Sequence, residues 1–191
     1  KAMGAQEMGL SDDEIQQIVT DWRDASPNIV KLWWDVDRAA NKALDTGKMQ
    51  TAGRLKIGYY DHKLFICLPS GRKLAYIEPE KRLNSFNRME LTYMGVGKTR
   101  KWERIMTYGP KLVENCIQAI ARDILAEAML RVDATGFDIV AHVHDEMIVE
   151  VPNGKSSVKE LCDMMAESPD WVDDKLPLRA DGYECEWYRK D

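Results

Sequence analysis

Two carboxylates and a histidine stand together between two short apolar runs. His144, Asp145 and Glu146 separate residues 139–143 from residues 147–151, and both runs are rich in β-branched and apolar side chains. Such runs predict two strands, and a connection this short makes them adjacent and antiparallel. Burying these carboxylates without a counter-charge would be costly. We therefore expect them either to face water or to hold a cation.

A second set of polar side chains recurs at helical spacing upstream. Lys111, Asn115, Gln118 and Arg122 fall at i, i+4, i+7 and i+11 within a predicted helix over residues 110–131. This stripe contains no carboxylate. Lys and Arg supply positive charge, and the amides can hydrogen-bond to sugars or base edges. The stripe suits contact with nucleic acid, and the alternative is an ordinary solvated helix face.

The apolar side chains of the same predicted helix mark the face that packs inward. Val113, Ile117, Ile120 and Ile124 share one side of it.

Further helices are predicted from caps and periodicity. Ser11 and Glu14 have the spacing of a capping box. Ser26 starts a second helix, which Gly47 ends, and Ser157 starts another.

Strands are predicted with less regularity. Residues 64–68 and 73–77 form a hairpin across residues 69–72, whose basic Arg72 and Lys73 either meet phosphate or keep the edge soluble. Residues 79–106 are irregular, and residues 176–180 alternate as a final strand.

Together, these patterns predict a helical half up to about residue 107. An α+β half follows, in which helices cover one face of an antiparallel sheet.

Charge is unevenly distributed along the 191 residues. The net charge is −5, yet residues 48–111 hold 14 Lys and Arg against 5 Asp and Glu, a local charge of +9. Such asymmetry suits a protein that binds phosphates with one region and metal ions with another, and the alternative is chance clustering of the charges. Basic residues surround an aromatic one at Lys98, Arg100, Lys101 and Arg104, around Trp102. This segment is either a loop that tracks a nucleic-acid backbone or a solvated loop anchored by one tryptophan.

Composition limits where in the cell the protein is expected to act. No apolar run approaches the length of a membrane span, and no signal-peptide pattern is present. The four cysteines lack paired metal-ligand spacing. We expect reduced thiols in a cytoplasmic protein without a membrane partner.

The helix and the hairpin together resemble the C-terminal half of the family-A DNA polymerases. The resemblance is carried by Lys111-Leu112-Val113-Glu114-Asn115-Cys116-Ile117-Gln118-Ala119-Ile120-Ala121-Arg122-Asp123 followed by His144-Asp145-Glu146, and it is closest to the phage and prophage branch. Further matches in the same order are Ser26-Pro27-Asn28-Ile29-Val30, Leu68-Pro69-Ser70-Gly71-Arg72 and Thr107-Tyr108-Gly109. It covers essentially the whole chain.

This resemblance implies an architecture and an activity. Residues 1–107 would be the C-terminal part of a fingers subdomain, and residues 108–191 would be a palm subdomain with an antiparallel sheet and covering helices. The activity would be DNA-directed DNA polymerisation, in which two divalent metal ions, Mg²⁺, promote nucleotidyl transfer. The partners would be primer-template DNA and a dNTP.

The resemblance also assigns roles to single residues. Asp145 corresponds to the metal-bridging aspartate, Glu146 to its auxiliary neighbour, and His144 to a residue near the primer terminus. Gln118 and Arg122 correspond to the helix that contacts template-primer in the minor groove. Asn115 and Lys111 share that stripe and match the family less tightly.

Parts of the family pattern are absent from these 191 residues. The other essential aspartate with its following glutamate does not occur, nor does the fingers helix with spaced Arg, Lys and Tyr. Lys1-Ala2-Met3-Gly4 is similar to the residues just after that helix. We therefore expect a C-terminal portion of a polymerase that is inactive alone and is completed by an N-terminal polymerase half.

Two alternatives come from other classes. One is a non-catalytic remnant that binds primer-template DNA through the basic region and the helix stripe. The other is a small metalloenzyme that uses His142 and His144 with Glu146 or Glu150, since alternate strand residues share a face.

Overall fold

The computed structural model describes residues 9–188, so the expected segment Lys1-Ala2-Met3-Gly4 lies outside the described residues. The chain divides into two compact units. Unit 1 comprises Lys1–Cys67 and Lys73–Glu114, and unit 2 comprises Leu68–Arg72 and Asn115–Asp191. Within the described part, helices and antiparallel sheets are both present, which confirms the predicted α+β class. The division into fingers at residues 1–107 and palm at residues 108–191 stays a prediction.

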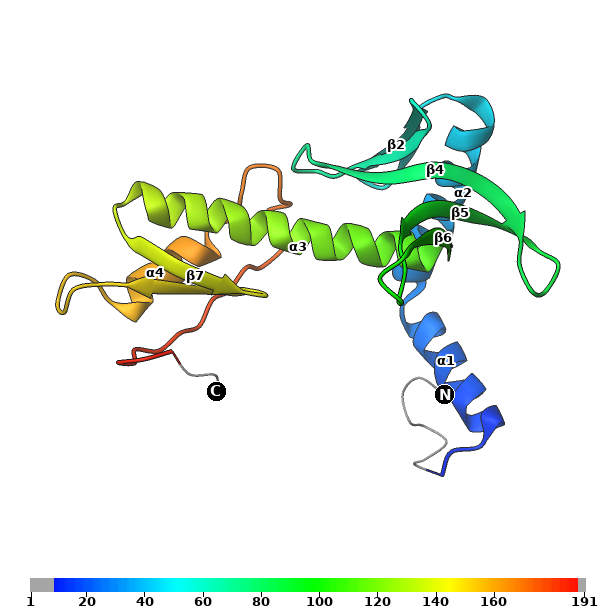
Figure 1. Cartoon of the computed structure of the whole chain (residues 1–191). Coiled ribbons are helices and arrows are strands. Elements are labelled where there is room, and N and C mark those ends of the chain that lie inside the picture. The colour runs from blue at the N-terminus through cyan, green and yellow to red at the C-terminus, as the bar shows by residue number, and fades with distance from the viewer. Residues whose placement is uncertain (1–8, 189–191) are drawn as a thin grey trace. The chain divides into compact units, whose positions relative to one another are not determined.

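Figure 1 shows the elements in chain order. The helices are α1 (Asp12–Ala25), α2 (Pro27–Thr46), α3 (Gly109–Ala134) and α4 (Val158–Ala166). The strands are β1 (Gln50–Ala52), β2 (Leu55–Tyr60), β3 (Lys63–Cys67), β4 (Lys73–Leu83), β5 (Met89–Val96), β6 (Trp102–Thr107), β7 (Asp138–Val143) and β8 (Glu146–Glu150).

The predicted helix boundaries of unit 1 are confirmed. The Ser11 side chain accepts from the Glu14 backbone N–H while the Glu14 carboxylate accepts from the Ser11 backbone N–H, which completes the capping box of α1. Pro27 occupies the first turn of α2. Gly47, at φ 65°, ends α2 in the left-handed conformation.

A six-stranded antiparallel sheet, ordered β1 to β6, makes up the rest of unit 1. The predicted hairpin across residues 69–72 is its β3–β4 pair. The prediction of a helical half up to residue 107 is wrong, because residues 79–106 complete β4 and form β5 and β6. A register shift between Ile77 and Glu80, with buried Pro79 inside it, interrupts the two-residue alternation of β4. The burial of β5 and β6 does not alternate either, so no period of two marks these strands.

The core of unit 1 lies between the sheet and α2. Ile57, Leu64 and Ile66 of the sheet are fully buried, as is Val36 of α2. Burying such side chains stabilises the unit by about 1.5–3 kcal/mol each. The core therefore fixes the sheet on α2.

Unit 2 is built on α3. The predicted helix is confirmed and runs three residues further than expected, to Ala134. Its buried face differs from the predicted one, because Ile117 is 55% exposed while Leu112 and Cys116 are buried. The prediction that Ile117 faces inward is therefore wrong.

The predicted hairpin of unit 2 is confirmed, with Val143 opposite Glu146. Within the described residues it is the only sheet of unit 2. The predicted strand over residues 176–180 is not formed. The Ser157 hydroxyl accepts from the Glu160 N–H and caps α4 as predicted.

All four cysteines lie in the described part and are free thiols. No helix within residues 9–188 is both long enough and apolar enough to cross a membrane.

Candidate functional site

The acidic tip of the β7–β8 hairpin points to solvent. His144 and Asp145 form the two-residue turn and Glu146 opens β8, and all three side chains are exposed. His144 has a φ of 52°, in the left-handed region that non-glycine residues seldom occupy. The Tyr188 hydroxyl donates to Glu146 Oε2 at 3.3 Å. The carboxylates are thus open to solvent, and the expectation that they hold a cation stays a prediction.

Helix α3 reaches the strand that leads into this tip. Arg122 Nη1 lies 3.3 Å from His142 Nδ1, and Arg122 Nη2 lies 3.2 Å from His142 Nε2. Because a guanidinium only donates, the contact uses an imidazole nitrogen as acceptor. His142 stands two residues before His144, and Figure 1 shows β7 running back along α3. The structure thus brings the predicted Arg122 to the base of the predicted tip.

The other stripe residues have different surroundings. Asn115 is half-buried and Gln118 is exposed, both on the part of α3 that belongs to unit 2. Lys111 lies in unit 1, and its ammonium is 2.9 Å from both carboxylate oxygens of Glu114. That hydrogen bond raises the pKa of Lys111. Glu114, which lies outside the stripe, therefore offsets the charge of Lys111, and the DNA-contact role expected for Lys111 stays a prediction.

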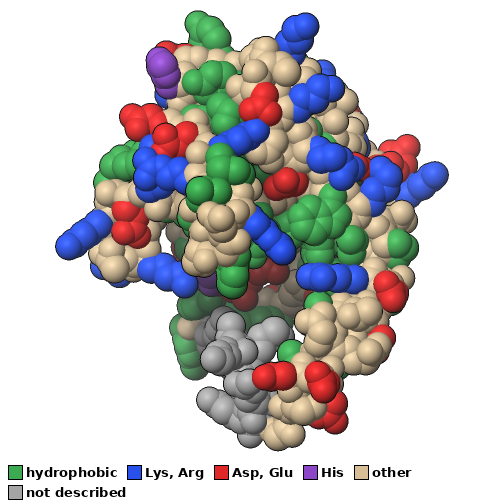
Figure 2. Space-filling model, turned by 90° about the vertical axis from the view of Figure 1, so that its right-hand side faces the viewer, with side chains coloured by type: hydrophobic (Ala, Val, Ile, Leu, Met, Phe, Trp, Pro, Cys, Tyr) green, Lys and Arg blue, Asp and Glu red, His purple; other side chains and the backbone are tan. Residues whose placement is uncertain are grey.

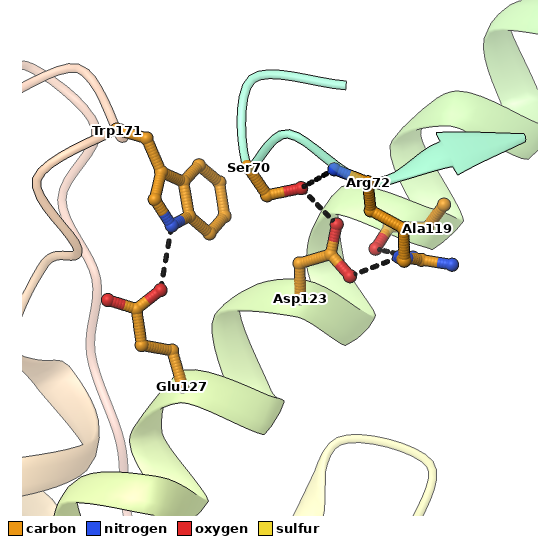
Figure 3. A network of polar contacts seen from close by, with 6 residues as sticks. All are labelled: Ser70, Arg72, Ala119, Asp123, Glu127 and Trp171. Carbon is orange, nitrogen blue, oxygen red and sulfur yellow. Dashed lines mark hydrogen bonds and ion pairs between the residues drawn. The ribbon is translucent and has the colours of Figure 1, made fainter. Parts of the chain in front are cut away.

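A polar network that the sequence analysis missed holds a different side of α3 (Figure 3). Asp123 accepts from Ser70 Oγ and from Arg72 Nε, both at 2.6 Å, and Arg72 Nη2 donates to the Ala119 carbonyl at 2.7 Å. The Asp123 side chain is only 13% exposed. Arg72, expected to meet phosphate or to serve solubility, instead ties the β3–β4 turn to α3. Its partner Asp123 is 51 positions away, so no local pattern could show the pair.

Two more contacts attach α3 to the C-terminal part of unit 2. The Trp171 indole N–H donates to Glu127 Oε2 at 2.7 Å (Figure 3). Arg131 donates to the backbone carbonyls of Met164 and Glu167, which lie at the C-terminal end of α4. A cation there also complements the helix dipole. Helix α3 thus binds the β7–β8 hairpin, the β3–β4 turn and the C-terminal end of α4.

The tip fits Mg²⁺ in the chemistry of its donors. Asp145 and Glu146 offer two carboxylates, and Mg²⁺ binds through one or two carboxylates together with waters and substrate phosphates. Among residues 9–188, no three His, Cys, Asp or Glu side chains gather into a cluster that could hold a metal ion. His142, a ligand in the metalloenzyme alternative, contacts the cationic Arg122 instead.

Charge also varies over the surface. In the face drawn in Figure 2, Lys and Arg side chains are spread over the upper part, with a few Asp and Glu among them. The sequence places the excess of positive charge in residues 48–111. Most of these residues form the six-stranded sheet.

Over its whole length the chain is similar to a DNA polymerase. The relative is the DNA polymerase of Bacillus phage SP02, which is 44% identical over 191 residues, or 99% of this chain. The chain spans 29% of the length of that phage protein. No family model matches the chain, and no solved structure matches it. The predicted resemblance to a phage DNA polymerase is confirmed at this level, and membership of family A stays a prediction.

Proposed function

We propose that this chain forms part of a family-A, DNA-directed DNA polymerase, with unit 2 carrying palm residues of the polymerase site. Its substrates would be primer-template DNA and a dNTP, and its cofactor Mg²⁺. The observation that carries the proposal is the contact of Arg122 with His142, at 3.2 and 3.3 Å. It joins the helix proposed to hold DNA to the hairpin proposed to hold metal. The 44% identity to a phage DNA polymerase supports the same conclusion.

The proposed roles follow from side-chain chemistry. Asp145 would hold Mg²⁺ with Glu146 as its auxiliary neighbour, and the bound ion would stabilise the charge that develops during nucleotidyl transfer. Gln118 and Arg122 donate hydrogen bonds that minor-groove acceptors of any base pair can receive. His144 would lie near the primer terminus. Asn115 extends the same helix stripe, and Lys111 contributes less because Glu114 neutralises it.

We further propose that the 191-residue chain alone does not incorporate nucleotides. The motifs for a second metal-binding aspartate and for the helix that binds the triphosphate do not occur in its sequence. A polypeptide equivalent to the remainder of the phage polymerase would supply both. Two carboxylates on one exposed turn hold Mg²⁺ weakly, because that ion sheds its waters reluctantly.

The test is complementation followed by substitution of the tip. The chain is mixed with the purified remaining part of the polymerase, and extension of a labelled primer is measured. We expect activity only with both polypeptides, and Asp145→Ala should lower kcat by roughly 10²–10⁴-fold, because an electrostatic partner of the transition state is lost.

Glu150→Gln is the matched control, since Glu150 is an exposed carboxylate of the same hairpin. It should retain the activity of the unsubstituted chain. Incorporation by the chain alone would refute its proposed inactivity. Equal activity of the Asp145→Ala and unsubstituted chains would refute the proposed site. Salt-dependent primer-template binding that persists without any activity would favour the DNA-binding remnant instead.

A further inference from the structure

Three successive hairpins of the sheet share one turn geometry. In each, the first residue of the turn donates its N–H to the carbonyl four positions on, and the fourth residue donates back to the first. The terminal pairs are Leu68 with Arg72, Asn84 with Arg88, and Gly97 with Lys101, at 2.8, 2.8 and 2.9 Å. The fourth residue is left-handed in all three: Gly71 at φ 88°, Asn87 at φ 60° and Arg100 at φ 59°.

The β5–β6 turn is exceptional in what occupies this position. Glycine and asparagine adopt left-handed backbone conformations readily, whereas a long side chain makes them costly. The turn itself therefore gains nothing from Arg100. An unfavourable residue at a turn indicates that its side chain serves a purpose outside the local fold.

The cationic side chains of this turn have no ion-pair or hydrogen-bond partner among residues 9–188. They are Lys98, Arg100 and Lys101, and all three are exposed. Arg104, which is close to them in the sequence, is instead bound to β4: it donates to the Glu78 carbonyl and forms an ion pair with Glu80 Oε1. The acid nearest the turn in the sequence is Glu103, whose carboxylate fills the space beside Gly97. Three cations and one carboxylate leave this turn clearly positive.

An exposed tryptophan, with an exposed valine opposite it, adjoins these cations. Trp102 is 59% exposed and faces Val96, 63% exposed, across the hairpin. Cations that follow a phosphodiester backbone, next to an aromatic ring on which bases stack, are the usual composition of a site for single-stranded nucleic acid.

We propose that the β5–β6 turn binds single-stranded DNA, with Lys98, Arg100 and Lys101 on its phosphates and Trp102 stacked on a base. The inference rests on the proposed function only for the identity of the ligand as DNA. It adds a second DNA-binding element, in unit 1, to the one proposed on α3.

The test exploits the backbone of the turn. Arg100→Gly removes the cation while placing a favoured residue in the left-handed position, so the variant should unfold at the same or a higher temperature. The triple variant Lys98→Ala/Arg100→Gly/Lys101→Ala should bind a labelled single-stranded oligothymidylate more weakly. It should also lower the slope of log affinity against log salt concentration by about 2, at roughly 0.7 per phosphate contact.

A control variant changes net charge equally. Lys42, Lys155 and Lys175 are exposed lysines outside the basic region 48–111, and Lys42→Ala/Lys155→Ala/Lys175→Ala should leave the slope of single-strand binding unchanged. Trp102→Leu should weaken single-strand binding on the order of tenfold. Trp102→Phe, which keeps an aromatic ring, should retain most of the affinity of the unsubstituted chain.

The outcomes separate this inference from the proposed function. Equal slopes for the two triple variants, or no binding of single strands by the unsubstituted chain, would overturn the inference. So would an equal loss of affinity for blunt duplex DNA, which indicates general attraction to phosphate. A loss of primer extension in Asp145→Ala alongside unchanged single-strand binding in the turn variants would overturn the inference while leaving the polymerase proposal standing. The reverse pattern would overturn the polymerase proposal alone.

Discussion

Two aspartates on α2, only two positions apart, occupy opposite electrostatic environments. Asp37 is half-buried, and its Oδ1 accepts from the Gly109 N–H at 2.9 Å, at the start of α3. Burial raises the pKa of Asp37 and outweighs the lowering effect of that hydrogen bond. Asp35 accepts from Lys31 and Arg38, each at 2.5 Å, and the Lys31 hydrogen bond is the main cause that lowers its pKa.

These shifts predict pH dependences of opposite sign. Because the pKa of Asp37 is higher in the folded state, its contribution to stability is present below the unfolded pKa and is lost as pH rises through the folded value. Asp37→Asn keeps an acceptor for Gly109 and should gain stability relative to the unsubstituted chain between about pH 4 and pH 7. Asp35 contributes above its unfolded pKa, so Asp35→Asn should lose relative stability over the same range.

Urea unfolding measured at several pH values checks both variants. Their free energies of unfolding, each relative to the unsubstituted chain, should diverge as pH rises. Parallel curves for the two variants would contradict the assigned environments.

At the scale of elements, side chains on different sides of α3 bind different segments of unit 2. Arg122 contacts His142 of β7. The next residue, Asp123, accepts hydrogen bonds from Ser70 and Arg72 of the β3–β4 turn. Successive helix residues project about 100° apart, so one turn of α3 connects to two separate segments of unit 2. This arrangement fixes the rotation of α3 and hence the direction of the Arg122 side chain.

Asp123→Ala should therefore be more damaging than the loss of an ordinary surface ion pair. It removes the partner of a partly buried guanidinium and of the Ser70 hydroxyl. We expect a loss of about 1–3 kcal/mol in the free energy of unfolding. Asp163→Ala, which breaks the exposed pair with Lys159 on α4, should cost less than about 0.5 kcal/mol.

A double-mutant cycle of Arg72→Ala with Asp123→Ala isolates their interaction. Additive effects in urea unfolding would show that the pair does not anchor α3.

At the scale of the whole molecule, α3 is shared by both units, with the boundary between Glu114 and Asn115. Its first residue, Gly109, packs against α2 so closely that an added Cβ would lie 2.1 Å from the Trp33 carbonyl oxygen. Since backbone cannot move aside as a side chain can, only glycine fits where α3 leaves unit 1.

Gly109→Ala should destabilise the chain by about 3 kcal/mol or more, or prevent folding. Gly182→Ala is the control, because the added Cβ would meet the Val158 side chain at 3.2 Å, which has room to adjust. Peptide-resolved hydrogen exchange should show lost protection first in unit 1, where Trp33 and Asp37 lie. Equal protection in both variants would refute this packing.

The sequence determined the elements whose signals are local. Helix caps, the Gly47 stop, the β3–β4 and β7–β8 hairpins and the extent of α3 follow from interactions within a few residues, so they could be predicted. The similarity to a phage DNA polymerase was likewise visible from ordered motifs.

Only the tertiary structure decided the rest. The register shift between Ile77 and Glu80 interrupts β4, and the buried side of α3 depends on what packs against it, which left Ile117 exposed. The Arg72–Asp123 and Arg122–His142 contacts join residues 51 and 20 positions apart. Such pairings depend on how the chain folds back on itself. The candidate site could therefore be named residue by residue from the sequence, but its assembly required the fold.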